Sequence, residues 1–300
     1  MQNKSKTSIF TGAATALITP FFDGKIDFSS LFSLIDKQIS EKISAIVLCG
    51  TTGEASTITD RERESLICAG AERIDSRVPL IVGVGSNNTE SSIKYTRFAA
   101  SHGADALLVV TPYYNKGTKN GIIEHYKSIA NETELPIIVY NVPSRTGVDL
   151  SISQLEALSD VKNIVAIKEA STDIEKAEKI VSIFGERYSL YSGNDSLILP
   201  YLAIGGKGVI SVISNILPKE TNEICSLFFN GDIEKSRELQ YKLLRLINMM
   251  FEETNPAPVK FAAYLLGLCK NELRLPLSPI QKELSDKIEI ELKKFTAIIE

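Results

Sequence analysis

Residues 164–169 read Ile164-Val165-Ala166-Ile167-Lys168-Glu169, an apolar run that ends in a lysine and a glutamate. The run is short, rich in Ile and Val and almost continuously apolar, which predicts a strand that is buried on both faces. Lys168 stands at its end, where an unpaired ammonium group would lose its hydration. Burial of this kind lowers the pKa of a lysine, and an uncharged lysine amine forms a Schiff base with a carbonyl group. The structural alternative is that Lys168 extends to solvent or pairs with Glu169.

Seven further apolar runs of the same kind are spread along the 300 residues. A longer amphipathic stretch follows each run, and the stretch at 60–74 begins with the capping pattern Thr59-Asp60-Arg61-Glu62. Eight strand–helix units in this order predict a closed (β/α)8 barrel, or TIM barrel. The expected strands are 14–19, 45–50, 80–84, 106–111, 137–141, 164–169, 189–192 and 208–212. The expected helices are 29–41, 60–74, 89–101, 120–132, 153–158, 173–184, 195–204 and 218–229.

The rest of the chain, from residue 232, has no comparable strand-like run and reads as three helices. We therefore expect a barrel domain over residues 1–231 and a C-terminal helical domain over residues 232–300. The main rival is an open doubly wound sheet. That rival is weakened because the chain lacks an early G-x-G-x-x-G fingerprint.

Composition narrows the classes of function. The formal net charge is −4, and no dense basic stripe is present, so nucleic acid and anionic membrane surfaces are poor partners. No apolar segment approaches the roughly 20 residues that a membrane span needs. The four cysteines are far apart and lack zinc spacing, which favours buried thiols in a reducing cytosol. We expect a cytoplasmic protein.

The sequence offers little for metal or redox chemistry. His102 and His125 are the two histidines, and both lie in stretches expected to be helical, where structural or solvated roles are common. The motifs HExxH, GxSxG and the Walker lysine loop are absent. We therefore expect neither a metal nor an organic cofactor.

Active sites of such barrels lie at the carboxyl ends of the strands. Lys168 stands at one of these ends, Tyr140 at another, and Thr51 and Thr52 follow a third within Gly50–Glu54. This set fits carbonyl chemistry through an imine, with a tyrosine hydroxyl for proton transfer and a glycine-bounded turn for a carboxylate. Arg145 could bind a second carboxylate. Taken singly, each has a structural alternative: Tyr140 as a half-buried aromatic, the turn as a turn only, and Arg145 as a surface ion pair.

In combination and order, these motifs resemble the dihydrodipicolinate synthases, a family of N-acetylneuraminate-lyase-like class I aldolases. The resemblance extends over essentially the whole chain. The residues that carry it are Gly50-Thr51-Thr52-Gly53-Glu54, Thr111-Pro112-Tyr113-Tyr114, Tyr140-Asn141-Val142-Pro143-Ser144-Arg145-Thr146-Gly147, Ile167-Lys168-Glu169-Ala170, Ser192-Gly193 and Gly208-Val209-Ile210-Ser211-Val212.

The resemblance implies the catalytic roles. Lys168 forms the Schiff base with pyruvate, and Tyr140 gives and takes protons at the imine and enamine. Thr51 links Tyr140 to Tyr114 in a proton relay, and Tyr114 enters from a neighbouring subunit. The implied assembly is a homotetramer built as a dimer of dimers.

The resemblance also implies how the substrates bind. Thr51 and Thr52 hold the pyruvate carboxylate, while Gly193 and the main chain of Ile210 line the pocket. Arg145 receives the carboxylate of L-aspartate 4-semialdehyde. The product is 4-hydroxy-tetrahydrodipicolinate, an intermediate of lysine (diaminopimelate) biosynthesis. Two alternatives remain: a pyruvate-dependent lyase acting on a sugar acid such as N-acetylneuraminate, and a non-catalytic barrel that binds a keto acid.

One departure from the family concerns feedback control. In family members that lysine inhibits, the pattern of the effector pocket has histidines just after the GTTGE turn and a glutamate soon after the GxGxN turn. Here those positions are Asp60, Arg63 and Ser91, although Asn87 and Tyr113 remain. We therefore expect weak or absent inhibition by lysine.

Overall fold

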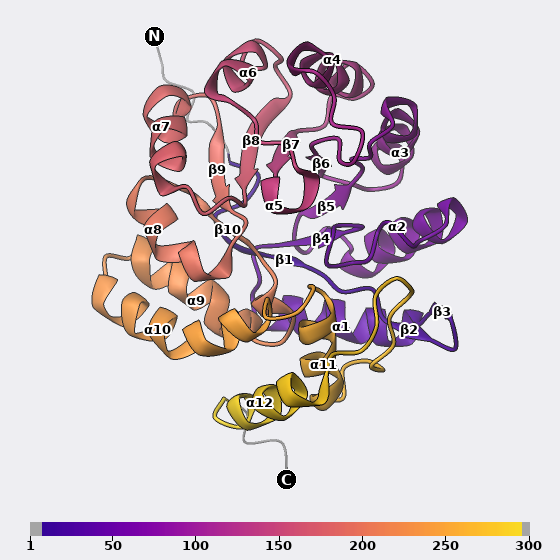
Figure 1. The fold of residues 1–300 in the computed structure, drawn as a ribbon, viewed down its shortest axis with the longest axis vertical. Helices are drawn as coiled ribbons and strands as arrows, with labels where there is room; N and C mark the ends of the chain where they lie inside the picture. Colours follow the sequence, from indigo (N-terminus) through magenta and orange to yellow (C-terminus); the bar gives the residue numbers. More distant parts are fainter. Residues whose placement is uncertain (1–7, 296–300) are drawn as a thin grey trace.

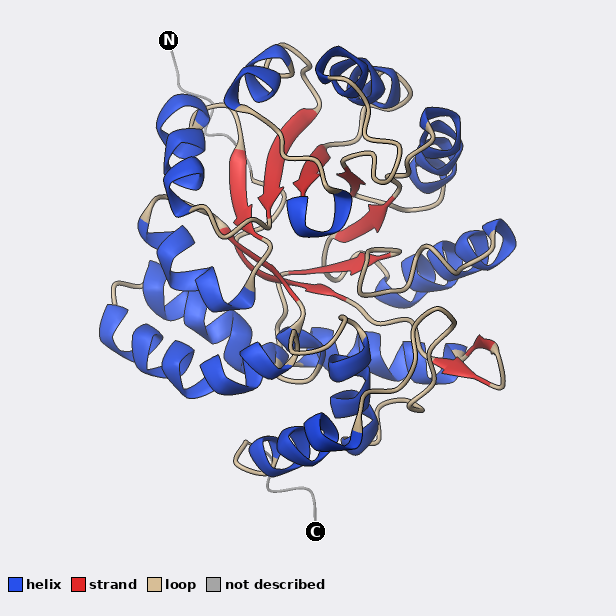
Figure 2. Cartoon of the chain, in the orientation of Figure 1, coloured by secondary structure: helices blue, strands red, loops and turns tan. Residues whose placement is uncertain are grey.

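The computed structural model describes residues 8–295, in which parallel strands close into a barrel surrounded by helices (Figures 1 and 2). Around the barrel the strand order is β1-β10-β9-β8-β7-β6-β5-β4. The barrel strands are β1 (Gly12–Ala16), β4 (Ala45–Leu48), β5 (Leu80–Gly83), β6 (Ala106–Val110), β7 (Ile137–Asn141), β8 (Ile164–Glu169), β9 (Ser189–Ser192) and β10 (Gly208–Ser211). This architecture confirms the predicted TIM barrel.

Helices follow the strands along the chain and cover the outside of the barrel (Figure 2). They are α1 (Phe28–Ser40), α2 (Asp60–Ile74), α3 (Thr89–Ser101), α4 (Lys119–Ala130), α5 (Pro143–Thr146), α6 (Ile152–Ala157), α7 (Ile174–Phe184), α8 (Ile198–Ala203) and α9 (Pro218–Phe229). The predicted start of α2 is confirmed, because Thr59 and Glu62 form a capping box there.

Three local predictions need correction. The first strand begins and ends earlier than expected, at Gly12 and Ala16. It does not extend to residue 19, because the Ile18 amide leaves the ladder to bond the Asn215 side chain. A hairpin of β2 (Phe21–Phe22) and β3 (Lys25–Ile26) follows it, where the expected strands include none. The expected helix at 195–204 begins as a 3₁₀ turn, η1 (Asp195–Leu197). Pro200 lacks the amide hydrogen that would continue an α-helix through this turn.

Alternating side chains along the strands build two apolar layers. One layer fills the barrel lumen and includes Ala166, and the other lies between strands and helices and includes Ile167. Because successive side chains of a strand point to opposite faces, Lys168 continues the lumen side and Glu169 continues the helix side. The packing of one strand therefore sets the directions of both charged residues.

The C-terminal helices are α10 (Ile233–Met249), α11 (Ala257–Leu265) and α12 (Lys282–Leu292), and α10 packs against α9 and α12 (orange to yellow in Figure 1). They match the three helices that were expected. Residues of all three belong to the same apolar cluster as the outer layer of the barrel. The division into domains at residues 231 and 232 stays a prediction.

Two ion pairs join this C-terminal region to the barrel. Lys260 of α11 pairs with Glu54, and both side chains are fully buried. Burial lowers the pKa of Lys260, and the Glu54 charge opposes that change. Arg274 pairs with Glu62. The hydrogen bonds from Arg274 are the main reason why the pKa of the Glu62 carboxyl is lowered to about 2. The C-terminal region is thereby fixed to the turn that follows β4 and to the start of α2.

Two chain-wide expectations can be checked. None of the helices within residues 8–295 combines the length and apolar character that crossing a bilayer requires. Cys49, Cys225 and Cys269 are buried free thiols, as expected, but Cys68 is exposed. That residue lies on α2, where part of the helix surface faces solvent.

Candidate active site

The carboxyl ends of the strands surround a cavity of about 520 Å³, here called the mouth cavity. A second cavity of about 450 Å³, the side cavity, adjoins it and shares Thr51, Tyr140 and Arg145 in its wall. The predicted site residues that line the mouth cavity are Lys168, Tyr140, Thr51, Thr52, Arg145 and Gly193. Residues from five different parts of the chain thus meet where barrel enzymes carry their active sites.

Lys168 and Tyr140 are neighbours in the register of β8 and β7. Lys168 is 6% exposed, and its Nζ lies 4.2 Å from the centroid of the Tyr140 ring. An ammonium group in this position is attracted by the electron-rich face of the ring. Within residues 8–295 Lys168 has no carboxylate at ion-pair distance, so the alternative of a pair with Glu169 is wrong. The amine is buried at the cavity without a fixed counter-charge.

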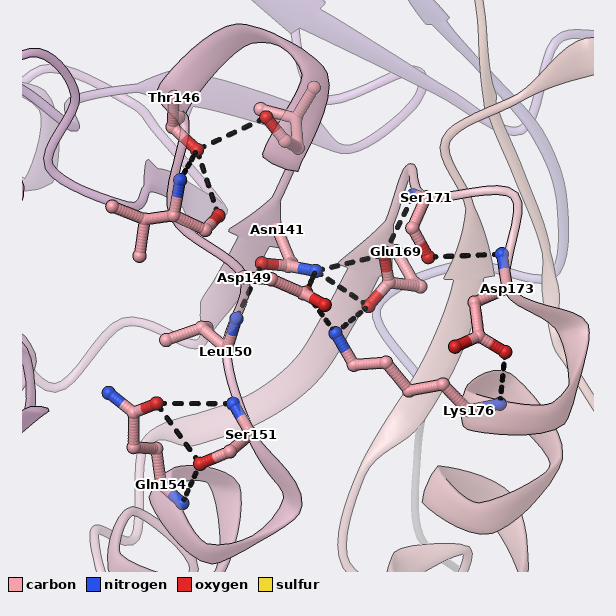
Figure 3. Close-up of polar contacts among 12 residues, drawn as sticks. Asn141, Thr146, Asp149, Leu150, Ser151, Gln154, Glu169, Ser171, Asp173 and Lys176 are labelled. Carbon is pink, nitrogen blue, oxygen red and sulfur yellow. Dashed lines mark hydrogen bonds and ion pairs between the residues drawn. The ribbon is translucent and has the colours of Figure 1, made fainter.

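Glu169 is held by other groups on the outside of the barrel (Figure 3). Its two carboxylate oxygens accept hydrogen bonds from Asn141 Nδ2 at 3.0 and 2.9 Å. The amide of Ser171 donates to it at 2.8 Å, and Lys176 Nζ of α7 lies 3.3 Å from Oε2. Lys176 also pairs with Asp149. Since Asn141 follows Tyr140 and Glu169 follows Lys168, this network fixes the two strand ends that carry the candidate catalytic pair.

A tight turn places Thr51 and Thr52 at the cavity. The amides of Gly53 and Glu54 donate to the carbonyl oxygens of Gly50 and Thr51, each at 3.1 Å. A Cβ on Gly53 would lie 3.0 Å from the Leu17 carbonyl oxygen, so a side chain there would strain the turn. Thr52 is buried, whereas Thr51 is partly exposed. The turn therefore holds both threonines at a fixed place in the wall of the mouth cavity.

Arg145 and Gly193 complete the wall of the mouth cavity. Arg145 lies on the single turn α5, is exposed, and donates from Nη2 to the Asn255 carbonyl oxygen at 3.0 Å. It has no carboxylate partner within residues 8–295, which removes the surface ion pair as its explanation in this chain. A Cβ on Gly193 would lie 2.4 Å from Ala170 Cβ, so only glycine fits there. Within residues 8–295, the Asn255 carbonyl oxygen is the one hydrogen-bond acceptor of the Arg145 side chain.

Two predicted site residues lie elsewhere in this chain. Tyr114 is 89% exposed and lines neither cavity. Ile210 is buried in the lumen layer below the mouth cavity, which Val212 of the same chain segment lines instead. The relay role of Tyr114 depends on a second chain and stays a prediction.

Sequence reasoning missed two residues that shape the site. Asn255 lies in the segment between α10 and α11, just before Pro256. Asp195 is fully buried, and its Oδ2 accepts the amides of Val212 and Ile213 at 2.9 and 3.0 Å. Burial raises the pKa of Asp195. Hydrogen bonds from the Ser211 hydroxyl and from those two amides, together with the Lys168 charge, act in the opposite direction and lower it. The two polar residues Asn194 and Asp195, directly after a buried strand, could have indicated Asp195 from the sequence. No comparable sequence pattern marks Asn255.

The side cavity contains a buried cation of the protein itself. Arg63 donates to the carbonyl oxygens of Gly83 and Ala55 at 3.0 and 2.9 Å, and its guanidinium lies 4.3 Å from the Tyr95 ring centroid. Asp60 is engaged by Lys94 and by the Tyr95 hydroxyl. Arg63 and Tyr113 line this cavity, whereas Asp60, Asn87 and Ser91 do not.

The histidines lie outside both cavities. His102 caps the C-terminal end of α3 and is exposed. His125 is buried in α4, where its Nδ1 lies 2.9 Å from Thr89 Oγ1, and burial lowers its pKa to about 4. Within residues 8–295, His, Cys, Asp and Glu side chains form no group of three that could hold a metal.

The Glu169 network predicts a stability difference between two lysines of α7. Lys176→Met leaves a buried carboxylate without its cation and should lower the free energy of unfolding by about 3 kcal/mol. Lys179→Met removes an exposed pair with Glu175 and should change it by less than about 0.5 kcal/mol. Adding Glu169→Gln to Lys176→Met should recover part of the loss. Chemical denaturation measures these values, and equal effects of the two lysine variants would refute the proposed coupling.

Comparison with known proteins adds independent information. The model of the Dihydrodipicolinate synthetase family matches residues 9–295. The 4-hydroxy-tetrahydrodipicolinate synthase of Alkaliphilus oremlandii is 48% identical over 95% of this chain and 99% of its own. The solved dihydrodipicolinate synthase of Thermotoga maritima superposes with a TM-score of 0.94 at 43% identity, covering 96% of this chain and 99% of that one. For the enzyme of Cyanidioschyzon merolae with lysine bound, the TM-score is 0.92 at 34% identity, with 96% and 98% covered. The chain belongs to the dihydrodipicolinate synthetase family.

Proposed function

We propose that this chain is a lyase that condenses pyruvate with L-aspartate 4-semialdehyde to give 4-hydroxy-tetrahydrodipicolinate, in lysine (diaminopimelate) biosynthesis. The observation that carries the proposal is Lys168, buried at the mouth cavity beside Tyr140 and without a carboxylate partner in the described residues. Near-full-length relatives that bear the name of this synthase support the same reaction. Pyruvate and the semialdehyde are the small-molecule partners.

The proposed reaction uses groups that already lie around the cavity. Lys168 Nζ attacks the keto carbon of pyruvate, and loss of water leaves a protonated imine, which acts as an electron sink. Removal of a methyl proton gives an enamine, whose carbon attacks the aldehyde. The amino group of the second substrate then displaces Lys168 and closes the ring. Tyr140 would carry the protons, and the distance of 4.2 Å between its ring centroid and Lys168 Nζ supports this assignment.

Substrate binding follows from the two ends of the cavity. The hydroxyls of Thr51 and Thr52 hold the pyruvate carboxylate, and Gly193 also lies in the wall of the mouth cavity. Arg145 receives the carboxylate of the semialdehyde, supported by its exposed position and its lack of a carboxylate partner within residues 8–295. Charge-assisted hydrogen bonds of this kind are stronger than neutral ones.

The proposal includes an assembly and a location. Tyr114 would extend into the site of a neighbouring chain and join Thr51 and Tyr140 in a proton relay, and its 89% exposure in the isolated chain is consistent with that use. We infer a homotetramer, a dimer of dimers, that works in the cytoplasm. The relatives named as this synthase and the solved neighbours support this reading, and not the alternatives of a sugar-acid lyase or a keto-acid-binding barrel without activity.

A paired assay tests the reaction. Pyruvate with the semialdehyde should give rapid turnover, whereas cleavage of N-acetylneuraminate should be undetectable. Lys168→Ala should lower turnover by about a thousandfold or more, because Lys168 is the one lysine among the described residues that line the cavity. Lys179→Ala, which changes an exposed lysine, is the control. Substantial turnover by Lys168→Ala would reject the imine mechanism, and efficient cleavage of the sugar acid would reject the substrate.

A substitution at Arg145 separates the two proposed carboxylate sites. Arg145→Ala should raise the KM for the semialdehyde about 10- to 100-fold, since a hydrogen bond to a charged group contributes about 1.5–3 kcal/mol. The KM for pyruvate should change less than about threefold. Steady-state kinetics with each substrate varied in turn give both values, and Arg237→Ala on the surface of α10 serves as the control. Equal losses for both substrates would mean that Arg145 is structural.

The side cavity bears on feedback by lysine. The cation of Arg63 already occupies the side cavity, and the carboxylate of Asp60 is already bound to Lys94 and Tyr95. A second cation would meet repulsion there instead of a free acceptor. We therefore expect L-lysine at millimolar concentration to leave turnover nearly unchanged. An inhibition constant well below the millimolar range would contradict this expectation.

A further inference from the structure

The segment between α10 and α11 extends to the mouth cavity and carries a residue that contacts both carboxylate-binding groups. Asn255 Nδ2 donates a hydrogen bond to Thr52 Oγ1 at 3.0 Å. Its main-chain carbonyl oxygen accepts a hydrogen bond from Arg145 Nη2, also at 3.0 Å. Asn255 is 5% exposed and lines the mouth cavity. The C-terminal region of the chain thus meets the two ends of the candidate site through one residue.

The hydrogen bond to Thr52 determines which way its hydroxyl points. A threonine hydroxyl has one hydrogen to donate and lone pairs to accept. Asn255 supplies a donor, so the Thr52 oxygen accepts on that side and its hydrogen is directed elsewhere. Thr52 lines the cavity, and within residues 8–295 no acceptor for this hydrogen is found. The hydroxyl is thereby prepared to donate to an anion in the cavity.

A buried ion pair fixes Asn255 relative to this threonine. Lys260, one turn into α11, pairs with Glu54, two residues after Thr52, and both side chains are fully buried. Lys260 Nζ also lies 4.2 Å from the centroid of the Phe21 ring. The turn and the α11 segment are therefore held together beside the hydrogen bond that joins them. Asn255 Oδ1 is buried without a partner in the described residues, so the side chain is held chiefly by the bond to Thr52.

We propose that Asn255 is a positioning residue, whose side-chain amide directs the Thr52 hydroxyl to donate to the carboxylate of the oxo acid. The inference rests on the proposed function, because it assigns the anion at Thr52 to pyruvate. It makes the C-terminal helical region part of the pyruvate site. The contact to Arg145 uses the main chain, so side-chain variants of Asn255 leave that contact in place.

The test measures pyruvate binding apart from the second substrate. Borohydride reduces the imine on Lys168, and the pyruvate concentration that gives half-maximal trapping reports binding at Thr52. Asn255→Ala should raise that concentration about tenfold, and Asn255→Asp should raise it further, because a carboxylate would accept the hydroxyl hydrogen and turn lone pairs toward the substrate. If the residue were only a spacer, the isosteric Asp variant would be the milder of the two. Asn248→Ala, the same change at an exposed site on α10, is the matched control.

A double-mutant comparison shows whether Asn255 acts through Thr52. In a Thr52→Ala background, Asn255→Ala should change half-maximal trapping by less than about twofold. In the otherwise wild-type protein, Asn255→Ala should keep the KM for the semialdehyde within about threefold of the wild-type value. If Asn255→Ala fails to fold, Asn255→Asp can be compared in the wild-type and Thr52→Ala backgrounds instead, because this substitution keeps the side-chain volume.

Three results would overturn the inference. The first is an unchanged half-maximal concentration in Asn255→Asp, and the second is an equal effect of Asn255→Ala with and without Thr52. The third is an equal rise in KM for both substrates, which would indicate a general structural role. If the wild-type protein is not trapped with pyruvate at all, the proposed function fails first, and this inference fails with it.

Discussion

The alternation of side chains along β8 is the constraint on which the site depends. Ala166 belongs to the lumen layer and Ile167 to the helix layer, so Lys168 enters the cavity and Glu169 points outward. Glu169 then takes its counter-charge from Lys176 of α7 and its hydrogen bonds from Asn141 and Ser171. A carboxylate in contact with an amine would stabilise the protonated form, which cannot attack a carbonyl. The strand thus separates two opposite charges that are adjacent in the sequence.

The C-terminal helices contribute to the same cavity from outside the barrel. The buried pair of Lys260 and Glu54 joins α11 to the turn after β4, and Arg274 joins the region to Glu62 at the start of α2. Residues 251–255 then form one side of the mouth cavity, where Asn255 meets Thr52 and Arg145. A barrel alone would leave this side open. The helical appendage is therefore expected to affect substrate binding as well as stability.

The fold and much of the site could be predicted because both leave local signals. Strands covered on both faces are continuous apolar runs, and residues that follow such runs gather at one end of a parallel barrel. Lys168, Tyr140 and Thr52 were found in this way. Asn255 could not be found, because its place depends on how α11 docks more than 200 residues from the turn that it contacts. The 3₁₀ start at Asp195 and the exposure of Tyr114 likewise depend on tertiary packing, and the use of Tyr114 depends on a second chain.

The central claim is that the Lys168 amine bonds covalently to a 2-oxo acid. Mass spectrometry of the protein after borohydride reduction in the presence of pyruvate, followed by peptide mapping, tests it most directly. The account predicts one pyruvate-derived adduct per chain, located on Lys168 and absent when either reagent is omitted. An unmodified protein, or an adduct located on a different lysine, would contradict it.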